Sequence, residues 1–146
     1  MNKYSLLILC LTLFSNASMA NSVSISCGAS KGYSYYFEGG LVDSSRTGFK
    51  DDGISKGQFS LILDDKGNAD VITKDGTGIL KSATSQGGQV QFLPAGNGSA
   101  NWVIAYGDGV LEIYSYSRAS KQATTYRNTV GVLLAKNSLF VSDCDS

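Results

Sequence analysis

The clearest structural signal in this sequence is NWVIAYGDGVLEIYSYS, residues 101–117. Large apolar side chains recur at every second position on both sides of Gly107-Asp108-Gly109. Alternation with a period of two is typical of a half-buried antiparallel strand, and glycine and aspartate tolerate the backbone conformations of a tight turn. The segment therefore predicts a hairpin of two strands, with Trp102 and Ile104 of the first strand in the core.

The same alternation recurs along the rest of the chain. No stretch of about ten or more residues has the i, i+3, i+4, i+7 spacing of an amphipathic helix. Short strands joined by Gly- and Asp-rich turns are typical of a barrel or a sandwich. We predict an all-β fold, an antiparallel meander of about nine or ten short strands in a closed or nearly closed barrel, with a β-sandwich as the second choice. The expected strands are residues 22–27, 33–37, 58–64, 69–74, 79–85, 89–93, 100–106, 110–117, 123–134, with an interruption near Asn128, and 138–144.

Residues 1–20 have the features of a signal peptide. Lys3 precedes the apolar run of residues 6–14, and Ser18-Met19-Ala20 supplies the small residues that signal peptidase recognises. The run is about half as long as a membrane-spanning helix requires, and the predicted strands of about 5–7 residues are shorter than spanning strands. We expect cleavage after Ala20, a single β domain over residues 21–146, no membrane span in the mature chain, and a periplasmic or secreted location.

Cleavage would remove Cys10 and leave Cys27 and Cys144 near the two ends of the mature chain. An even number of cysteines in an exported protein favours a disulfide, and two free thiols are the alternative. A bridge that closes a loop of about 100 residues stabilises a fold by about 4.7 kcal/mol when only chain entropy is counted. This bridge would also bring the first and last strands together and so close the sheet.

The composition argues against several classes of function. Twelve Lys and Arg residues balance 12 Asp and Glu residues, which leaves no electrostatic attraction for nucleic acid. Histidine, the usual general base and a common zinc ligand, does not occur in the sequence. Neither the G-x-S-x-G motif nor a phosphate-binding loop is present. We expect no nucleic-acid partner, no metal and no cofactor.

Tyrosine is concentrated in two of the predicted strands, in residues 33–37 and residues 110–117. Its apolar ring and polar tip suit contacts with sugar rings, peptides or partner proteins. The alternative is that these rings only stabilise the sheet as cross-strand pairs. The candidate binding residues are Tyr33, Tyr35, Tyr36, Glu112, Tyr114 and Tyr116.

The alternation in residues 110–117 allows two orientations of this strand. We expect Leu111 and Ile113 to face the core, because they are the aliphatic side chains of the segment. Glu112, Tyr114 and Tyr116 would then share the outer face.

Residues 38–57 interrupt the regular spacing of strands and turns. A segment of this length without secondary structure is either functional or contains an element that the pattern misses. Leu41-Val42 is a candidate short strand, and we expect Phe49 and Ile54 to hold the segment against the core.

Residues 64–70 and Asp51-Asp52-Gly53 are rich in acidic side chains but lack the ligand order of an EF-hand loop. We expect these aspartates to bond their own backbone in turns. No spacing marks a pair of carboxylates for acid–base catalysis, and serine and lysine are too frequent to single out a nucleophile.

Short motifs near both ends of the mature chain carry a family resemblance. Ser26-Cys27-Gly28, Gly32-Tyr33-Ser34-Tyr35-Tyr36 and SLFVSDC at residues 138–144 resemble segments of small exported bacterial β-proteins of uncharacterised function. The layout is distantly similar to that of periplasmic lysozyme inhibitors, which are small β-barrels with a disulfide near the chain ends. The inhibitors' contact motif is not present, so the resemblance assigns no functional residue.

These observations predict an exported, soluble, non-enzymatic binding protein. It would recognise a protein, a glycan or a small ligand through an aromatic strand face and residues 38–57. Two alternatives remain open: a small hydrolase that uses carboxylates or a Ser-Lys pair, and a hollow barrel that carries a ligand, which requires a cavity of several hundred Å³.

Overall fold

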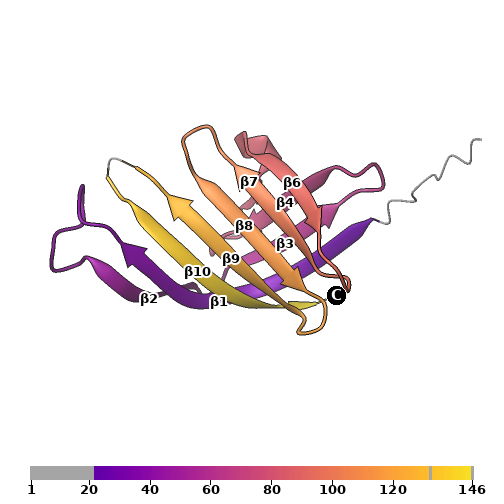
Figure 1. The fold of residues 1–146 in the computed structure, drawn as a ribbon, viewed down its shortest axis with the longest axis horizontal. Coiled ribbons are helices and arrows are strands. Elements are labelled where there is room, and N and C mark those ends of the chain that lie inside the picture. Colours follow the sequence, from indigo (N-terminus) through magenta and orange to yellow (C-terminus); the bar gives the residue numbers. More distant parts are fainter. Residues whose placement is uncertain (1–21, 132, 146) are drawn as a thin grey trace, which may run out of the picture.

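Ten antiparallel strands form one sheet that curls into a half-barrel (Figure 1). The computed structural model describes residues 22–131 and 133–145, so the predicted signal peptide lies outside the described residues. The all-β prediction is confirmed, and no helix in these ranges has the length and apolarity needed to cross a bilayer. The elements are β1 (Val23–Tyr36), β2 (Gly48–Ile54), β3 (Gln58–Leu63), β4 (Ala69–Lys74), β5 (Leu80–Ser82), the 3-10 turn η1 (Thr84–Gln86), β6 (Gln89–Pro94), β7 (Ala100–Ala105), β8 (Leu111–Ser117), β9 (Gln122–Thr129) and β10 (Lys136–Asp145).

Two meanders meet at β1. Strands β10, β9, β8, β7 and β6 follow one another from one edge of β1, while β3, β4 and β5 follow from the other edge. Strand β2 pairs with β1 beyond the end of β3. The pairing of the first and last strands is confirmed, but it does not close the barrel. The described sheet instead ends at β5 and β6, and the half-barrel is open there because these two strands share no ladder.

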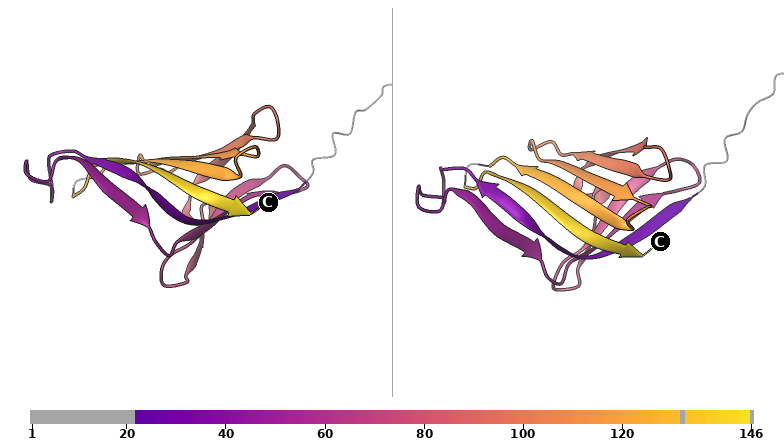
Figure 2. Two further views of the ribbon diagram at one scale, coloured as in Figure 1. Left: turned by 90° about the horizontal axis from the view of Figure 1, so that it is seen from below. Right: turned by 60° about the horizontal axis from the view of Figure 1, so that its bottom comes forward.

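The two meanders face each other across the core. Figure 2 shows the sheet folding over, with β3 to β5 turned beneath the layer of β6 to β10, and β4 approaches β6 and β7. The indole N–H of Trp102 on β7 donates a 2.8 Å hydrogen bond to the carbonyl oxygen of Ile62 on β3. Leu61, Trp102 and Ile104 are fully buried. The predicted core positions of Trp102 and Ile104 are therefore confirmed.

A β-bulge in β1 decides which of its side chains face the concave side of the sheet. The register of β1 against β10 shifts between Cys27 and Ser30. The extra residue changes the inward-facing positions from odd to even numbers. Ile25 is buried before the bulge and Ser34 after it. The strands predicted at 22–27 and 33–37 are therefore one strand, and the bulge conceals this by breaking the alternation.

Part of the irregular segment at residues 38–57 is strand β2, which the sequence pattern did not reveal. Its central residues Lys50, Asp51 and Asp52 carry no apolar alternation. Phe49 is 76% exposed and Ile54 is 52% exposed, so the expectation that they hold the segment against the core is wrong. Hydrogen bonds to β1 hold the strand instead. The short strand expected at Leu41-Val42 is reduced to a single bridge between Gly39 and Val42.

Strand β8 presents the opposite face to the interior from the one predicted. Glu112, Tyr114 and Tyr116 are buried, whereas Leu111 and Ile113 lie half-buried on the convex side. The prediction assumed that a glutamate stays outside and that aliphatic side chains take the core. A carboxylate can occupy the interior when a cation and a hydrogen-bond donor accompany it, and Glu112 has both.

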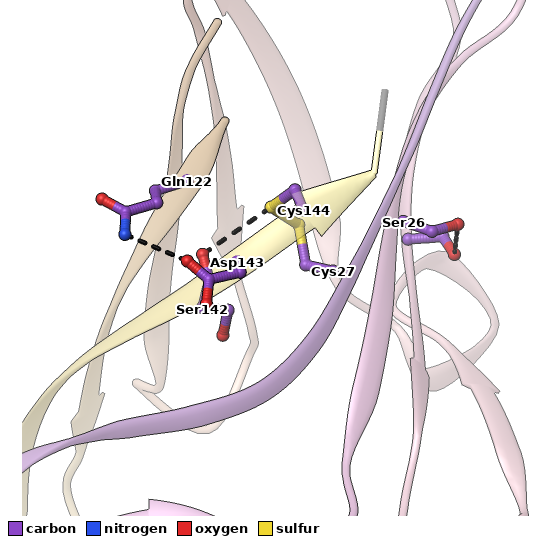
Figure 3. Close-up of a disulfide and its surroundings, with 7 residues drawn as sticks. Ser26, Cys27, Gln122, Ser142, Asp143 and Cys144 are labelled. Carbon is purple, nitrogen blue, oxygen red and sulfur yellow. Dashed lines mark hydrogen bonds between the residues drawn. A yellow bond between two sulfur atoms is a disulfide. The ribbon is translucent and has the colours of Figure 1, made fainter. Parts of the chain in front are cut away.

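Cys27 on β1 and Cys144 on β10 join the two ends of the described chain (Figure 3). Their sulfur atoms lie 2.04 Å apart, which is the distance of a disulfide bond, and the two residues face each other in the ladder. Beside them, Gln122 of β9 donates a 3.0 Å hydrogen bond to Asp143 of β10. The predicted cysteine pairing is confirmed.

Removing this disulfide should lower the free energy of unfolding by about 2–5 kcal/mol. The physical reason is that the bridged residues are 117 positions apart, so the bond restricts almost the whole unfolded chain. Urea unfolding should show the same loss for the Cys27→Ser/Cys144→Ser double variant and for reduced wild-type protein. Ser26→Ala, which changes an exposed neighbour, serves as the control. An unaltered free energy in the double variant would contradict the expectation.

Gly32 of β1 lies where a side chain would strike the neighbouring strand. A Cβ atom at this position would overlap the carbonyl oxygen of Leu139 on β10. We therefore expect Gly32→Ala to cost about 1–3 kcal/mol of stability, as overpacking does elsewhere. The matched control is Gly96→Ala, because nothing lies within 4 Å of a Cβ atom added there. Equal urea midpoints for the two variants would contradict this expectation and show that β10 shifts away from the added methyl group without loss of stability.

Candidate ligand-binding cavity

The concave face of the half-barrel contains a cavity of about 720 Å³. Its wall includes Asp52 of β2, Val71 of β4, Glu112 of β8, Arg127 of β9 and Lys136 of β10. Both meanders and β2 therefore contribute to it. The volume is in the range of pockets that enclose one small organic ligand.

Strand register determines the chemistry of the wall, because side chains two residues apart on a strand share a face. One inward-facing row crosses β1, β10, β9 and β8 at Gly32, Phe140, Thr125 and Tyr114. The adjacent row crosses the same strands at Ser34, Ser138, Arg127 and Glu112. Apart from the two β1 residues, all members of these rows line the cavity, so the wall changes from partly aromatic to polar between one row and the next.

Glu112 is a buried carboxylate with two partners. Its side chain is 8% exposed, and its Oε1 lies 3.2 Å from Nε of Arg127. Its Oε2 accepts a 3.0 Å hydrogen bond from the hydroxyl of Tyr114. Arg127 stands directly opposite Glu112 in the β8–β9 ladder. The register of the sheet therefore builds this pair and positions the half-exposed guanidinium at the cavity.

Asp52 is the centre of a second polar cluster, which joins β2, β1 and β10. Its Oδ2 accepts hydrogen bonds of 2.6 Å from the Ser34 hydroxyl and 2.8 Å from the Lys136 ammonium. The Tyr36 hydroxyl lies 3.4 Å from both Asp52 Oδ2 and Lys136 Nζ. Ser34 also shares a 2.6 Å hydrogen bond with Ser138. The cluster therefore fixes Lys136 at the cavity wall.

These contacts keep the charged groups ionised. Burial alone would raise the pKa of Asp52, but hydrogen bonds from Lys136, Ser34 and the Gly53 amide outweigh it, so this pKa is lowered. Burial opposes the charge of Lys136, but the hydrogen bond and attraction to Asp52 prevail and raise its pKa. Burial and the nearby Glu112 charge raise the pKa of Tyr114, so its hydroxyl keeps its proton and donates.

Four of the six predicted binding residues lie on the concave side. Glu112 and Tyr114 line the cavity, and Tyr36 contacts the cluster around Asp52. Tyr116 is only 4% exposed and belongs to the core. Glu112, Tyr114 and Tyr116 are therefore not on the outer surface where the sequence placed them. A binding role for them stays a prediction.

Tyr33 and Tyr35 lie on the convex side, away from the other four residues. Tyr33 is 60% exposed. Tyr35 packs edge-on against Phe37 and Phe49, with ring centroids 5.0 Å apart in both pairs. The six residues therefore do not form one surface, because the bulge and the orientation of β8 divide them between the two faces of the sheet.

Sequence reasoning did not single out Arg127 or Lys136, and it expected Asp52 to bond its own backbone in a turn. Asp52 lies instead in strand β2: its Oδ1 accepts the Gly53 amide, but its Oδ2 accepts from Ser34 and Lys136. The available signal was the alternation of Thr125, Arg127 and Thr129 in β9, a strand whose outward positions are also polar. An inward face that is itself polar leaves no apolar periodicity to detect. Only the register of the sheet brings these side chains together.

The acid-rich segment at residues 64–70 forms a turn, as predicted. Oδ1 of Asp64 accepts hydrogen bonds from the backbone amides of Lys66 and Asn68 at 2.9 and 2.7 Å. The Asn68 side chain donates to the other carboxylate oxygen. The Asp64 carboxylate thus stabilises the turn by accepting hydrogen bonds from the backbone that follows it.

Comparisons of the chain with protein-family models, with curated proteins and with solved structures find no significant match. The interpretation of the cavity therefore depends on its geometry and chemistry alone.

Acidification should weaken the fold through Asp52. Because the pKa of Asp52 is lowered in the folded protein, its contribution is complete above the ordinary aspartate pKa of about 3.9 and is lost as the pH falls through the lower, folded-state value. The Asp52→Asn variant should have a lower free energy of unfolding than wild type at about pH 5. Between about pH 5 and pH 2 it should lose less of that free energy than wild type does, as measured by urea unfolding. Asp51→Asn, on the opposite face of β2, is the matched control. Equal acid sensitivity of Asp52→Asn and wild type would exclude this role.

Proposed function

We propose that the protein is exported and binds a small polar ligand in the cavity of its half-barrel. Two features support export: the leader-like sequence of residues 1–20, and the disulfide pair, which is typical of oxidising compartments outside the cytoplasm. A periplasmic or secreted location follows from this proposal.

The observation that carries the binding role is a cavity wall of charged side chains that are already held in place. Arg127 is positioned by Glu112, and Lys136 by Asp52 and Tyr36. A wall whose polar groups are fixed before the ligand arrives loses little conformational entropy on binding. A small-molecule site is usually a concave space in which a small number of polar groups point toward the ligand.

A binding role is favoured over hydrolysis by the state of Asp52 and Glu112, the two carboxylates that contact Lys136 and Arg127. Every carboxylate oxygen of Asp52 and Glu112 has at least one partner within hydrogen-bonding distance. A general acid or base needs a carboxyl group that can reach the proton of a substrate. These two carboxylates instead hold the neighbouring cations.

A small ligand is favoured over a macromolecular partner by the placement of the tyrosines. The predicted aromatic face is split, with Tyr33 on the convex side and Tyr114 buried in the cavity wall. The segment at residues 38–57 contributes to binding through Asp52 and Ile54 of β2, which line the cavity.

Filling the cavity should abolish ligand binding without changing the rest of the surface. Thr125 lies on the inner face of β9 between Tyr114 and Phe140, so Thr125→Trp places an indole in the cavity. Thr124→Trp, on the exposed outer face of the same strand, is the matched control. The probes are a panel of hexoses, amino acids and hydroxy acids, and the measurement is the ligand-induced rise in Tm.

At least one class of probe should raise the Tm of wild type and of Thr124→Trp, but not that of Thr125→Trp. The proposal fails if no class stabilises the wild type, or if Thr125→Trp responds as wild type does.

A further inference from the structure

On the basis of the proposed function, we infer that the ligand is a hydroxylated carboxylic acid whose carboxylate is bound by Arg127 and Lys136. The two cations lie on the inner faces of adjacent strands and both line the cavity. Arg127 is paired with Ser138, which is two residues from Lys136. Diagonal positions of this kind lie about 7–8 Å apart or less, within reach of long side chains.

Asp52 and Glu112, the carboxylates beside Lys136 and Arg127, have little capacity left to accept hydrogen bonds from a ligand. Oδ2 of Asp52 receives Ser34, Lys136 and Tyr36, and Oδ1 receives the Gly53 amide. Glu112 receives Tyr114 on one oxygen and faces Arg127 with the other. Both groups therefore serve to position the cations.

The cations, in contrast, retain donors. The contact of Arg127 with Glu112 runs from Nε to Oε1 at 3.2 Å, and within the described residues the two Nη atoms make no hydrogen bond. The Arg127 side chain is 51% exposed, so this edge of the guanidinium is accessible. Two parallel N–H groups on such an edge match the two oxygens of a carboxylate.

Lys136 supplies a further donor. Its ammonium carries three N–H groups and contacts Asp52 and Tyr36. One N–H therefore remains for a ligand. Most of the hydrogen-bonding groups that remain free in this part of the wall are therefore donors. Such donors favour a ligand group that only accepts hydrogen bonds, as a carboxylate does.

Charge balance favours a monoanion over a dianion. Asp52 and Lys136 neutralise each other, as do Glu112 and Arg127. The other charged side chains of the wall are two cations and two anions, Lys74, Lys81, Asp75 and Asp108, so the wall has no net charge with which to hold a doubly charged group. A phosphate monoester would bring about 1.5–2 negative charges close to two carboxylates, whereas a carboxylate brings one.

The remainder of the cavity suits a hydroxylated carbon skeleton. Thr125 and Ser138 present hydroxyl groups close to the two cations, and Phe140 and Tyr106 present rings. Hydroxyl groups of a ligand can both donate to and accept from such side chains, and its C–H faces can pack against the rings.

Isothermal titration calorimetry of the mature domain tests this inference with four probes: D-glucuronate, D-gluconate, D-glucose and D-glucose 6-phosphate. At least one of the two acids should bind with a Kd at least about tenfold lower than that of glucose. Arg127→Gln should raise the Kd of that acid at least about tenfold, because the two parallel hydrogen bonds are lost. Arg127→Lys keeps the charge without the two-pronged geometry and should lie in between.

Arg46→Gln is the matched control, since Arg46 is an exposed arginine paired with Asp43 outside the cavity. It should leave the Kd of the acid unchanged. Thermal unfolding of each variant shows whether it is folded. If Arg127→Gln does not fold, the Kd measured for Arg127→Lys still tests the inference.

Three outcomes would overturn the inference. Glucose binding as tightly as both acids would remove the role of the carboxylate but leave the proposed function intact. Tightest binding of glucose 6-phosphate would assign the cations to a phosphate. Failure of both acids to bind would exclude this class of ligand, and the proposed function would then depend on the neutral sugars and amino acids of the cavity-filling experiment.

Discussion

Hydrogen bonding along both edges of β1 is the constraint on which the rest of the structure depends. One edge pairs with β10 over most of the strand, and the other pairs first with β3 and then with β2. The strand is therefore the centre of a curled sheet, with one meander on each side, and the sheet stays open where β5 and β6 share no ladder. The bulge after Cys27 keeps both halves of β1 turned toward the same interior.

The register that follows from this arrangement also creates the cavity chemistry. Ser34, Ser138, Arg127 and Glu112 form one row only because β1, β10, β9 and β8 are aligned as they are. A shift of one strand by one residue would turn its side chains to the other face and leave a buried carboxylate without its cation. The stability of the fold and the proposed ligand recognition thus depend on the same alignment, since the pairing that makes the burial of Glu112 tolerable also positions Arg127 at the cavity.

The all-β class, most strand positions and the cysteine pairing could be predicted from the sequence. Alternating apolar residues report on burial, and the two cysteines of the predicted mature chain, Cys27 and Cys144, favoured a disulfide. Strand β2 was missed because its polar residues carry no alternation. The bulge was missed because a single inserted residue looks like the end of one strand and the start of another. The inward face of β8 was assigned wrongly because Glu112 is tolerated in the interior only through its partner Arg127. That residue lies on the next strand, β9, and the sequence of β8 alone does not show the pairing. The cavity residues Asp52, Arg127 and Lys136 come from β2, β9 and β10, so only the register could reveal them.

The position of the disulfide has a consequence for survival in a protease-rich environment. The bond joins residues 27 and 144, so every exposed turn of the sheet lies inside the loop that it closes. A peptidase that cuts one of these turns produces two fragments that remain covalently attached, with their strands still paired. The nicked molecule would migrate as an intact chain until a reductant separates its halves.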